Sequence, residues 1–518
     1  MSKVLMLSEF KGLAPRFAPH LAKGWALTAE NCDLRTRKIR PVDGPSLQES
    51  DDNDYNSLFY YNSDWELGDD RHYLEWKIGN HDLLIYLDSG VPKKKVGSTT
   101  ADLGQTRPSA PTLAESGGGA LDDTYTYIIT TTRSVGGHTD ESGPSDSASI
   151  TVSAKTIQVT APTISDSDVT YWNIYRMSDS SAAYQFVAQV EAGTSSYLDN
   201  TLDADLDASP DTWYTSDQGN TIVFDKPTVQ SATFGGLTAQ IYTGMIFAWS
   251  GSTLYWSEPG YPDAWPSFYN MNFPSDIKAV IPFAGTVAVL TETGPFRVDG
   301  THPELLQQTQ AMSNEPCIAG AACKTRHGVA YLSDSGICVF DLARVTVITD
   351  GHFTEDWFTG NVAAATALLV ENDDQIYLFH SAGTLVGDMR VKPWIWHTLD
   401  ITATAVHRRD DDGELYYVDD DGVQKLGAGS DLAWTWRSGD LLAEHPRDKM
   451  WQSVEVQGAG AVTLFAYVDD ALIASKSLTF DMDRNRCLRF PDETRGRALQ
   501  LELTGTGTVT EIEITYTP

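Results

Sequence analysis

The sequence predicts an all-β protein organised around a β-propeller. Helical periodicity is almost absent from the 518 residues, and one β-rich pattern recurs along most of the chain. Each copy has an apolar run, a short polar turn with a glycine, and a second alternating run, which is typical of a β-hairpin. The copies are "LLIYLDSGVPKKK" (83–95), "MIFAWSGSTLYWSE" (245–258), "VAVLTETGPFRVDG" (287–300), "VAYLSDSGICVFDL" (329–342), "IYLFHSAGTLVGDM" (376–389) and "LYYVDDDGVQKLGA" (415–428).

The spacing of these hairpins indicates a repeated blade. The turn glycines are Gly90, Gly251, Gly294, Gly336, Gly383 and Gly422, and the last five are separated by 43, 42, 47 and 39 residues. A period of about 40–45 residues matches one four-stranded propeller blade per repeat. We therefore expect about six or more blades, to which the N-terminal strands and "TIVFDKP" (221–227) could add another. The alternative is a set of unrelated hairpins in a long β protein.

An inserted domain is expected where the period fails. The interval between Gly90 and Gly251 is 161 residues, and residues 108–210 within it are rich in Ser, Thr and Asp. Gly117–Gly119 lie near the start of this segment and Pro210 near its end. About seven short strands in roughly 100 residues favour a β-sandwich, whose ends can lie close together so that a propeller closes around it. The expected strands include residues 124–133, 147–153, 156–162, 169–177, 184–190 and 195–199.

The two ends of the chain differ from the middle. After about residue 440, alternating segments predict a C-terminal β-sandwich. Near the N-terminus we expect a short helical turn around Leu21–Ala29 and one strand in "CDLRTRKIRP" (32–41), with Leu34 and Ile39 as its apolar anchors. The expected domains are an N-terminal element with the first blade or blades (1–105), the insert (106–212), the main part of the propeller (213–440) and the C-terminal sandwich (441–518).

Charge singles out the segment 32–41. The chain has 37 Lys and Arg against 71 Asp and Glu, a formal net charge of −34, yet this segment carries Arg35, Arg37, Lys38 and Arg40. So few cations cannot hold DNA against that net charge, because phosphate binding needs positive charge to displace counterions. We expect them to meet acidic patches on a neighbouring blade or subunit. Solvated charge and nucleic-acid contact are the alternatives, and a saline habitat would also explain an acidic surface.

Motifs for chemistry are missing from the sequence. It contains no GxSxG, GxGxxG, P-loop or HExxH pattern, and its five cysteines show no metal-ligand spacing, so we expect them to be reduced. The Asp-rich segments 408–413 and 417–422 lack the ligand order of an EF-hand and are expected to be solvated turns, with a looser calcium site as the alternative. The aromatic clusters 256–268 and 392–399 are expected to pack between blades, with a surface that binds a glycan or docks a protein as the alternative. We expect no catalytic residue, metal or cofactor.

Segments along the whole chain resemble virion proteins of tailed bacteriophages. The opening residues 10–42 are similar to theirs at Phe10, Gly12, Pro15, Leu21, Ala29, Asn31, Leu34, Arg40 and Pro41. Residues 124–199 resemble the fibronectin-III-like modules of these proteins, through "YTYIITTT", "ESGPS", "WNIYRM" and "AGTSSYLD". "LYWSEPGYPDAWP" with "VAVLTETGPFRVDGT" resembles their propeller, and residues 488–514 resemble their closing sandwich.

The resemblance implies a structural subunit of the tail or neck, closest to the nozzle or tail-tubular proteins of short-tailed phages. It implies a closed homo-oligomeric ring, with six subunits as the expected order, around an acidic channel for DNA that passes without specific binding. The ring would dock to the adaptor or head–tail connector and other tail proteins. The protein would be made in the host cytoplasm and carried in the virion, with no membrane span and no enzymatic activity. Phe10, Arg16, Arg35, Arg37, Lys38 and Arg40 are the expected subunit-interface residues. A tail-side adhesion protein that binds a host glycan or receptor is the alternative, and a hydrolase is a third.

Overall fold

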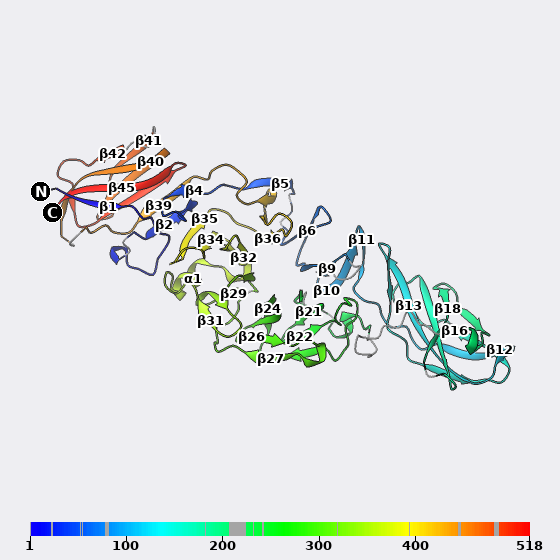
Figure 1. The fold of residues 1–518 in the computed structure, drawn as a ribbon. Helices are drawn as coiled ribbons and strands as arrows, with labels where there is room; N and C mark the ends of the chain where they lie inside the picture. The colour runs from blue at the N-terminus through cyan, green and yellow to red at the C-terminus, as the bar shows by residue number, and fades with distance from the viewer. Residues whose placement is uncertain are drawn as a thin grey trace. The chain divides into compact units, whose positions relative to one another are not determined.

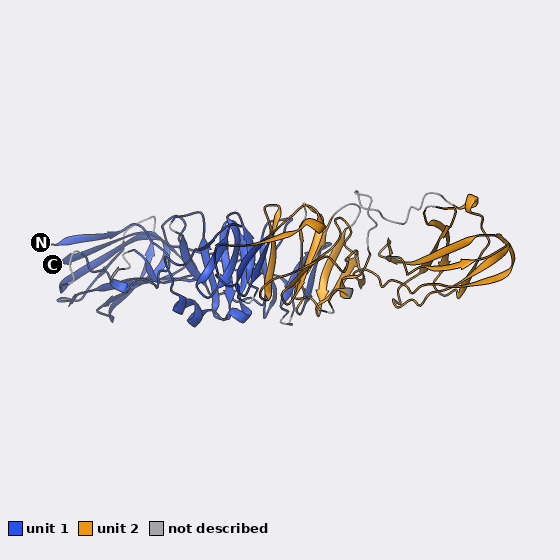
Figure 2. Cartoon of the chain, turned by 90° about the horizontal axis from the view of Figure 1, so that it is seen from below, with its two compact units in different colours: residues 1–69, 288–297, 310–518 blue, residues 70–287, 298–309 orange. Residues whose placement is uncertain are grey.

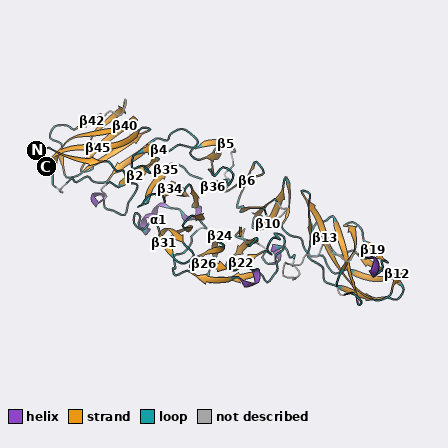
Figure 3. Cartoon of the chain, in the orientation of Figure 1, coloured by secondary structure: helices purple, strands orange, loops and turns teal. Residues whose placement is uncertain are grey.

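The protein is all-β, as the sequence predicts, and strands dominate the computed structural model (Figures 1 and 3). The structure describes residues 2–21, 24–51, 53, 55–77, 82–181, 183–206, 224–231, 233–240, 243–318, 320–392, 394–443, 447–480 and 486–518. Helical structure in these residues is limited to short pieces. They are α1 (Glu355–Asn361) and the 3-10 turns η1 (Pro19–Leu21), η2 (Asp203–Asp205), η3 (Pro227–Val229), η4 (Pro303–Leu305) and η5 (Ala364–Thr366).

The chain forms two compact units, which Figure 2 distinguishes by colour. Unit 1 comprises residues 1–69, 288–297 and 310–518, and unit 2 comprises residues 70–287 and 298–309. In the part of the chain that the structure describes, no helix is both long and apolar enough to cross a membrane.

Six groups of four strands recur along the chain. Three have the strand orders β8-β9-β10-β11, β20-β21-β22-β23 and β24-β25-β26-β27. Their strands are β8 (Tyr73–Trp76), β9 (Leu83–Asp88), β10 (Val91–Val96), β11 (Thr99–Asp102), β20 (Gly236–Gln240), β21 (Met245–Ser250), β22 (Thr253–Trp256), β23 (Asn270–Asn272), β24 (Ile277–Phe283), β25 (Thr286–Thr291), β26 (Gly294–Asp299) and β27 (Gln307–Gln310).

The other three groups lie later in the chain, with the orders β28-β29-β30-β31, β32-β33-β34-β35 and β36-β37-β38-β5. Their strands are β28 (Ala322–Thr325), β29 (Gly328–Ser333), β30 (Gly336–Phe340), β31 (Val345–Val347), β32 (Leu368–Asn372), β33 (Gln375–His380), β34 (Gly383–Asp388), β35 (Ile395–Leu399), β36 (Ala405–Arg408), β37 (Leu415–Asp419), β38 (Gly422–Lys425) and β5 (Ser46–Ser50). The group β32–β35 is one end of a larger sheet, in which β35 pairs in parallel with β2 (Ala26–Glu30).

The six predicted hairpins are confirmed, and each supplies the two central strands of one group. All six turn glycines have positive φ, from 54° at Gly251 to 134° at Gly383. This is the backbone region that glycine adopts without steric cost. The repeated glycine is therefore a marker of the central turn.

The last group is completed from the opposite end of the chain. β5 pairs antiparallel with β38, with Ser50 opposite Gly422 and Ser46 opposite Lys425. β6 (Ser57–Tyr61) and β7 (Asp64–Gly68) form a separate hairpin, and β6 lies beside β36. An N-terminal strand thus completes the sixth group and does not form part of an additional group. Of the segment 221–227, residues 221–223 lie outside the described residues.

The inserted segment forms two sheets around one core. Tyr127, Ile129 and Trp172 from one sheet pack with Ile157 and Val159 from the other. The first sheet has the order β12-β16-β19, and the second has β14-β13-β17-β18 with β15 also paired to β13. The strands are β12 (Thr112–Leu121), β13 (Thr124–Val135), β14 (His138–Glu141), β15 (Ala148–Thr151), β16 (Lys155–Thr160), β17 (Tyr171–Ser178), β18 (Gln185–Glu191) and β19 (Ser196–Asp199).

The six strands expected in this segment are present, while β12 and β14 were not expected. The run Gly117–Gly119 resembles a linker in the sequence, but it lies inside β12. The register of β12 against β16 shifts between Ser116 and Gly118, and Gly117 has φ +63°. Glycine in a strand commonly marks such a bulge, which composition alone does not distinguish from a boundary.

The C-terminal strands form two sheets joined by one long strand, β40 (Lys449–Val468). Its first half pairs with β45 and its second half with β44. Side chains from both halves, including Val454 and Leu464, share one core with β44 and β45. The other strands are β1 (Lys3–Leu7), β2 (Ala26–Glu30), β39 (Trp434–Ser438), β41 (Ala471–Phe480), β42 (Arg486–Arg489), β43 (Arg495–Gly496), β44 (Leu499–Gly505) and β45 (Thr508–Thr517). β1 pairs with β45 and β2 with β39, so the N-terminus contributes to both sheets.

Two N-terminal expectations were wrong. The region expected to be a helical turn around Leu21–Ala29 contains the end of η1 and the strand β2, while residues 22–23 lie outside the description. The segment 32–41 is not one strand but a hairpin of β3 (Cys32–Asp33) and β4 (Arg40–Pro41). Pairing of β2 with β39 stabilises the strand in place of a helix. The expected domain limits 105/106 and 440/441 stay predictions, and 212/213 lies outside the described residues.

Candidate assembly surface

Asn31 sets the course of the hairpin 32–41. Its φ of +54° turns the chain out of β2, and its side chain is buried. The Asn31 Nδ2 donates to the carbonyl of Ala433 at 3.1 Å, and its Oδ1 accepts from the Asp400 amide at 2.9 Å. Asn tolerates the left-handed region better than most residues because its short polar side chain bonds locally. The hairpin is therefore fixed at its base by both backbone conformation and side-chain bonds.

The four clustered cations divide into two kinds. Arg35 forms a bidentate ion pair with Asp33, with N–O distances of 2.9 and 3.0 Å. Arg37 forms an ion pair with Glu9. Burial alone would raise the pKa of Asp33, but hydrogen bonds from Arg35 hold that pKa below its usual value. These two arginines are thus occupied within the chain. Lys38 is half-buried and Arg40 exposed, and within the described residues neither side chain makes an ion pair or hydrogen bond.

Lys38 and Arg40 are placed by the residue between them. Ile39 is fully buried and exchanges two backbone hydrogen bonds of 3.0 Å with Val509, in β45. Because neighbours along an extended chain point to opposite faces, burial of Ile39 directs Lys38 and Arg40 to the outer face. The predicted apolar anchors Leu34 and Ile39 are both buried, 1% and 0% exposed.

A groove of about 370 Å³ opens beside these two cations. We call it the cation groove, and it is lined by Lys38, Arg40, Pro41, Gly458, Ala459, Thr508 and Thr510. The lining residues other than the two cations have small side chains, so the surface between the cations and β40 is recessed. A Cβ atom on Gly458 would lie 2.0 Å from the carbonyl oxygen of Thr508, so only glycine allows this close approach. The groove thus combines positive charge with a floor of small side chains.

The other two expected interface residues lie elsewhere in unit 1. Phe10 is only 1% exposed and packs edge-on against Trp436, with ring centroids 5.2 Å apart. Phe10 therefore belongs to the core of its own chain and is not a contact residue on the surface. Arg16 is exposed and pairs with the Asp350 carboxylate and with the Asp350 carbonyl.

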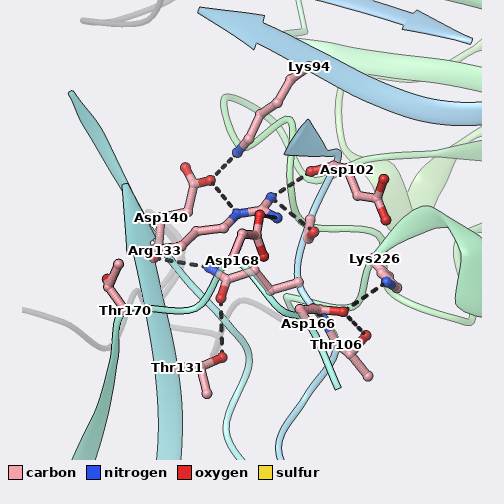
Figure 4. A network of polar contacts seen from close by, with 12 residues as sticks. Lys94, Asp102, Thr106, Thr131, Arg133, Asp140, Asp166, Asp168, Thr170 and Lys226 are labelled. Atoms are coloured by element: carbon pink, nitrogen blue, oxygen red, sulfur yellow. Dashed lines mark hydrogen bonds and ion pairs between the residues drawn. The ribbon is translucent and has the colours of Figure 1, made fainter. Parts of the chain in front are cut away.

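A second polar cluster, in unit 2, joins the insert to the β8–β11 sheet (Figure 4). We call it the ionic junction: Lys94, Arg133, Asp140, Asp168 and Asp263. Lys94, on β10, contacts Asp140 of β14 and lies 2.9 and 3.0 Å from the two Asp263 oxygens. Arg133, on β13, pairs with Asp168 at 2.8 Å and donates to the Asp102 carbonyl at 2.5 Å.

The two cations of the ionic junction are buried. The Lys94 and Arg133 side chains are each 2% exposed, whereas the Asp168 side chain is 43% exposed. Burial and the neighbouring Asp263 raise the pKa of Asp140, whereas Lys94 lowers the pKa of Asp263 despite its burial. Removal of one partner from such a cluster leaves a buried charge without compensation, which is costly. The junction therefore acts as a structural connection.

The structure also shows the Asp-rich turns and the aromatic clusters for which expectations were drawn from the sequence. Arg409 pairs with Asp411 and Asp412 in the turn of 408–413, while Asp420 and Asp421 are exposed. Across the described chain, no group of three or more His, Cys, Asp or Glu side chains could hold a metal ion. Of the expected aromatic clusters, Trp256, Trp265 and Trp396 are buried, which agrees with packing, but Phe268 is 62% exposed.

Sequence reasoning missed the ionic junction altogether. Its members lie between residues 94 and 263, and no short motif connects them. The available signal was weak: a lysine at an inward position of the alternating strand "VPKKKV" needs a buried partner. The division of the cation cluster was missed as well, because it depends on the turn at Arg37, whose φ is +60°.

The described geometry defines an all-β protein whose conspicuous polar clusters are structural. No family model and no curated protein matches the chain. Among solved structures, the CNH domain of AfRom2 matches at 11% identity and a TM-score of 0.25, covering 61% of this chain and 98% of its own. The extracellular domain of a B. thetaiotaomicron protein assigned to the one-component systems matches at 9% identity and a TM-score of 0.28, covering 84% and 77%. An exo-β-1,3-galactanase from Phanerochaete chrysosporium matches at 9% identity and a TM-score of 0.18, covering 71% and 94%. These similarities are too low to assign an activity.

Proposed function

We propose that this chain is a structural subunit of a homo-oligomeric ring in the tail or neck of a tailed bacteriophage. The ring would resemble a nozzle or tail tube, surround an acidic channel for DNA and dock to adaptor and other tail proteins. The observation that carries the proposal is a pair of cations, Lys38 and Arg40, that have no partner among the described residues and lie beside a groove on a chain of net charge −34. Such cations are available for contacts with another acidic subunit, and the resemblance of residues 10–42 to phage virion proteins points to the same role.

We also propose that the six strand groups are blades of one β-propeller. Within unit 2, the first strand of each group contacts the first strand of the next group, β8 with β20 and β20 with β24. Within unit 1, β28 contacts β32 and β32 contacts β36 in the same way. Propeller blades place their first strands around a common axis, and an N-terminal strand such as β5 commonly completes the last blade. The insert would be the fibronectin-III-like sandwich and the strands after residue 440 the closing sandwich.

The acidic composition supports a channel through which DNA passes freely. At physiological salt the Debye length is about 8 Å, so carboxylates on a lumen surface repel phosphate only at close range. That range is sufficient to keep a passing duplex from adhering.

Electron microscopy of the purified full-length protein tests the assembly. Closed rings with a central channel are expected, and the protein should not retain labelled duplex DNA at physiological salt. A protein that stays monomeric at all accessible concentrations would contradict the ring, and a lumen lined mainly by Lys and Arg would contradict the channel.

A further inference from the structure

We propose that the cation groove is the docking site for one acidic hairpin end of a second copy of this chain. That hairpin end, which we call the acidic tip, consists of Glu49, Asp51, Asp420 and Asp421. The inference rests on the assembly function proposed above and names the two surfaces that would meet.

The groove is suited to carboxylates by its charge and its shape. Lys38 and Arg40 flank the buried Ile39, and neither has a partner within the described residues, unlike Arg35 and Arg37. Small residues of β40 and β45 leave about 370 Å³ beside them. A narrow hairpin end fits such a space better than a flat surface does.

The acidic tip is formed by two strands from distant parts of the sequence. The turn Asp420–Asp421 joins β37 to β38, and β5 pairs with β38 so that Ser50 lies opposite Gly422. A Cβ atom on Gly422 would be 2.6 Å from the Asp51 amide nitrogen, which places Asp51 directly beside the turn. Asp420, Asp421 and Glu49 are exposed, and no cation contacts their carboxylates in the part of the chain that the structure describes.

A neighbouring acidic turn differs from this tip in having a cation of its own chain. The turn 410–412 also carries three aspartates, but Arg409 contacts two of them from the same chain. Within the described residues the acidic tip has no such internal cation, so its carboxylates remain available to cations of another chain. Among the surfaces of this acidic chain, the cation groove offers two free cations in a recess.

Two different surfaces in contact give a head-to-tail arrangement. The groove lies on the C-terminal sheets and the tip on the β36–β38 group, so each copy presents one groove and one tip. Head-to-tail contacts of this kind generate rings when the rotation between copies closes. The proposed contact therefore fits a ring rather than a symmetric dimer.

Charge reversal tests the contact in the full-length protein. The variants K38E/R40E and D420K/D421K should each weaken self-association by about 100-fold or more, because juxtaposed like charges are strongly unfavourable. A mixture of the two variants, and a single chain with all four substitutions, should regain association. The matched controls are R495E/R497E and D492K/E493K, which change the same charge at exposed positions of unit 1. Mass photometry and sedimentation velocity at low salt, about 50 mM, and at physiological salt measure association.

The outcomes separate the docking contact from the assembly function. If the unmodified protein forms rings and both groove and tip variants form them equally well, the contact is wrong and the ring stands. If the controls lose association as strongly, general charge and not this contact is responsible, which also overturns the proposal. An unmodified protein that never associates overturns both. Duplex DNA that binds the unmodified protein but not K38E/R40E would assign the groove to nucleic acid instead.

Discussion

Asn31 is the residue on which the position of the cation groove depends. Replacement by alanine removes the bonds to Ala433 and Asp400 and places a β-carbon in a left-handed conformation, at φ +54°. Ala433 and Asp400 are exposed residues, so water can replace part of each lost bond, and each bond is worth about 0.5–1.5 kcal/mol. The strained backbone adds about 1 kcal/mol. We expect Asn31→Ala to lower the free energy of unfolding by about 2–4 kcal/mol, measured by denaturant titration.

Asn31→Gly separates the two contributions. Glycine relieves the backbone strain but restores neither hydrogen bond, so this variant should be less destabilised than Asn31→Ala by about 1 kcal/mol. Equal stability of the two variants would show that the backbone conformation contributes nothing. A variant as stable as the unmodified protein would contradict the role of Asn31.

His397 makes stability depend on pH. Burial lowers the pKa of His397 to about 4, even though Asp33 and Asp388 nearby favour its charged form and Arg35 opposes it. The side chain is 5% exposed, and its Nδ1 has no hydrogen-bond partner in the described part of the chain. The unfolded chain takes up this proton near pH 6.5, whereas the folded chain does so only near pH 4. His397 therefore destabilises the fold progressively as the pH falls from 6.5 to 4, by at most about 3 kcal/mol.

The variant His397→Gln tests this dependence. Its free energy of unfolding should fall less steeply between pH 6.5 and 4 than that of the unmodified protein, whatever its stability at neutral pH. Urea titrations at several pH values give the two slopes. Parallel slopes would show that His397 is not the group that titrates.

Residue-level prediction from sequence succeeded where local pattern determines the outcome. Leu34 and Ile39 were expected to anchor the segment 32–41, and both are buried. The pairing of Arg37 with Glu9 could not be foreseen, because it joins residues from separate parts of the N-terminal region across a turn with positive φ. Cation clustering is visible in a sequence, but the division into paired and free cations is a property of tertiary structure.

The hairpin of β13 and β14 is held to β10 by the ionic junction. Lys94→Met would remove the cation that bridges Asp140 and Asp263, although Asp140 would keep its 3.3 Å pair with Arg133. Loss of one partner from a buried cluster costs about 3–5 kcal/mol. We expect a loss of stability of that size, with faster amide hydrogen exchange concentrated in β10, β13 and β14. Hydrogen exchange with mass spectrometry and a denaturant titration measure the two effects.

Lys93 provides the matched control on the same strand. Lys93 pairs with Asp88 at 3.2 Å, and both side chains are about one-third exposed. Such surface pairs are worth about 0–1 kcal/mol, so Lys93→Met should change little. Adding Asp140→Asn and Asp263→Asn to Lys94→Met should recover part of the lost stability. Equal effects of Lys93→Met and Lys94→Met would contradict the structural role of the junction.

Element-level prediction was strongest where a turn requires glycine. Gly294, Gly336, Gly383 and Gly422 all have φ between 122° and 134° at the start of a strand, and their regular spacing located four of the groups. The same residue type misled at Gly117–Gly119, where a bulge occurs inside β12. The continuity of β40 across two sheets was also missed, because alternation defines a strand but not its partners.

At the scale of the whole molecule, pairing between the two ends of the chain could not be predicted from the sequence. β1, β2 and β5 complete sheets whose other members lie between β32 and β45, and no local pattern specifies such partners. The interrupted period, in contrast, marked a segment that forms two sheets with a core of its own. An interrupted repeat can be recognised from the spacing of residues along the sequence, whereas predicting β pairing between distant segments requires knowledge of which segments contact each other.

The two ends of the insert lie close together, which makes its removal the sharpest test of its independence. Arg107 pairs with Asp225 at 2.6 Å, and a Cβ atom on Gly104 would lie 2.7 Å from that of Lys226. The insert also has its own core, including Tyr127, Ile157 and Trp172. Replacing residues 106–224 by a short Gly-Ser linker should therefore leave a folded all-β protein. Circular dichroism and hydrogen exchange should show that the six strand groups persist, with a modest loss of stability near Lys94, which loses Asp140 but keeps Asp263. Global unfolding or aggregation of the shortened chain would show that the insert is part of the main fold.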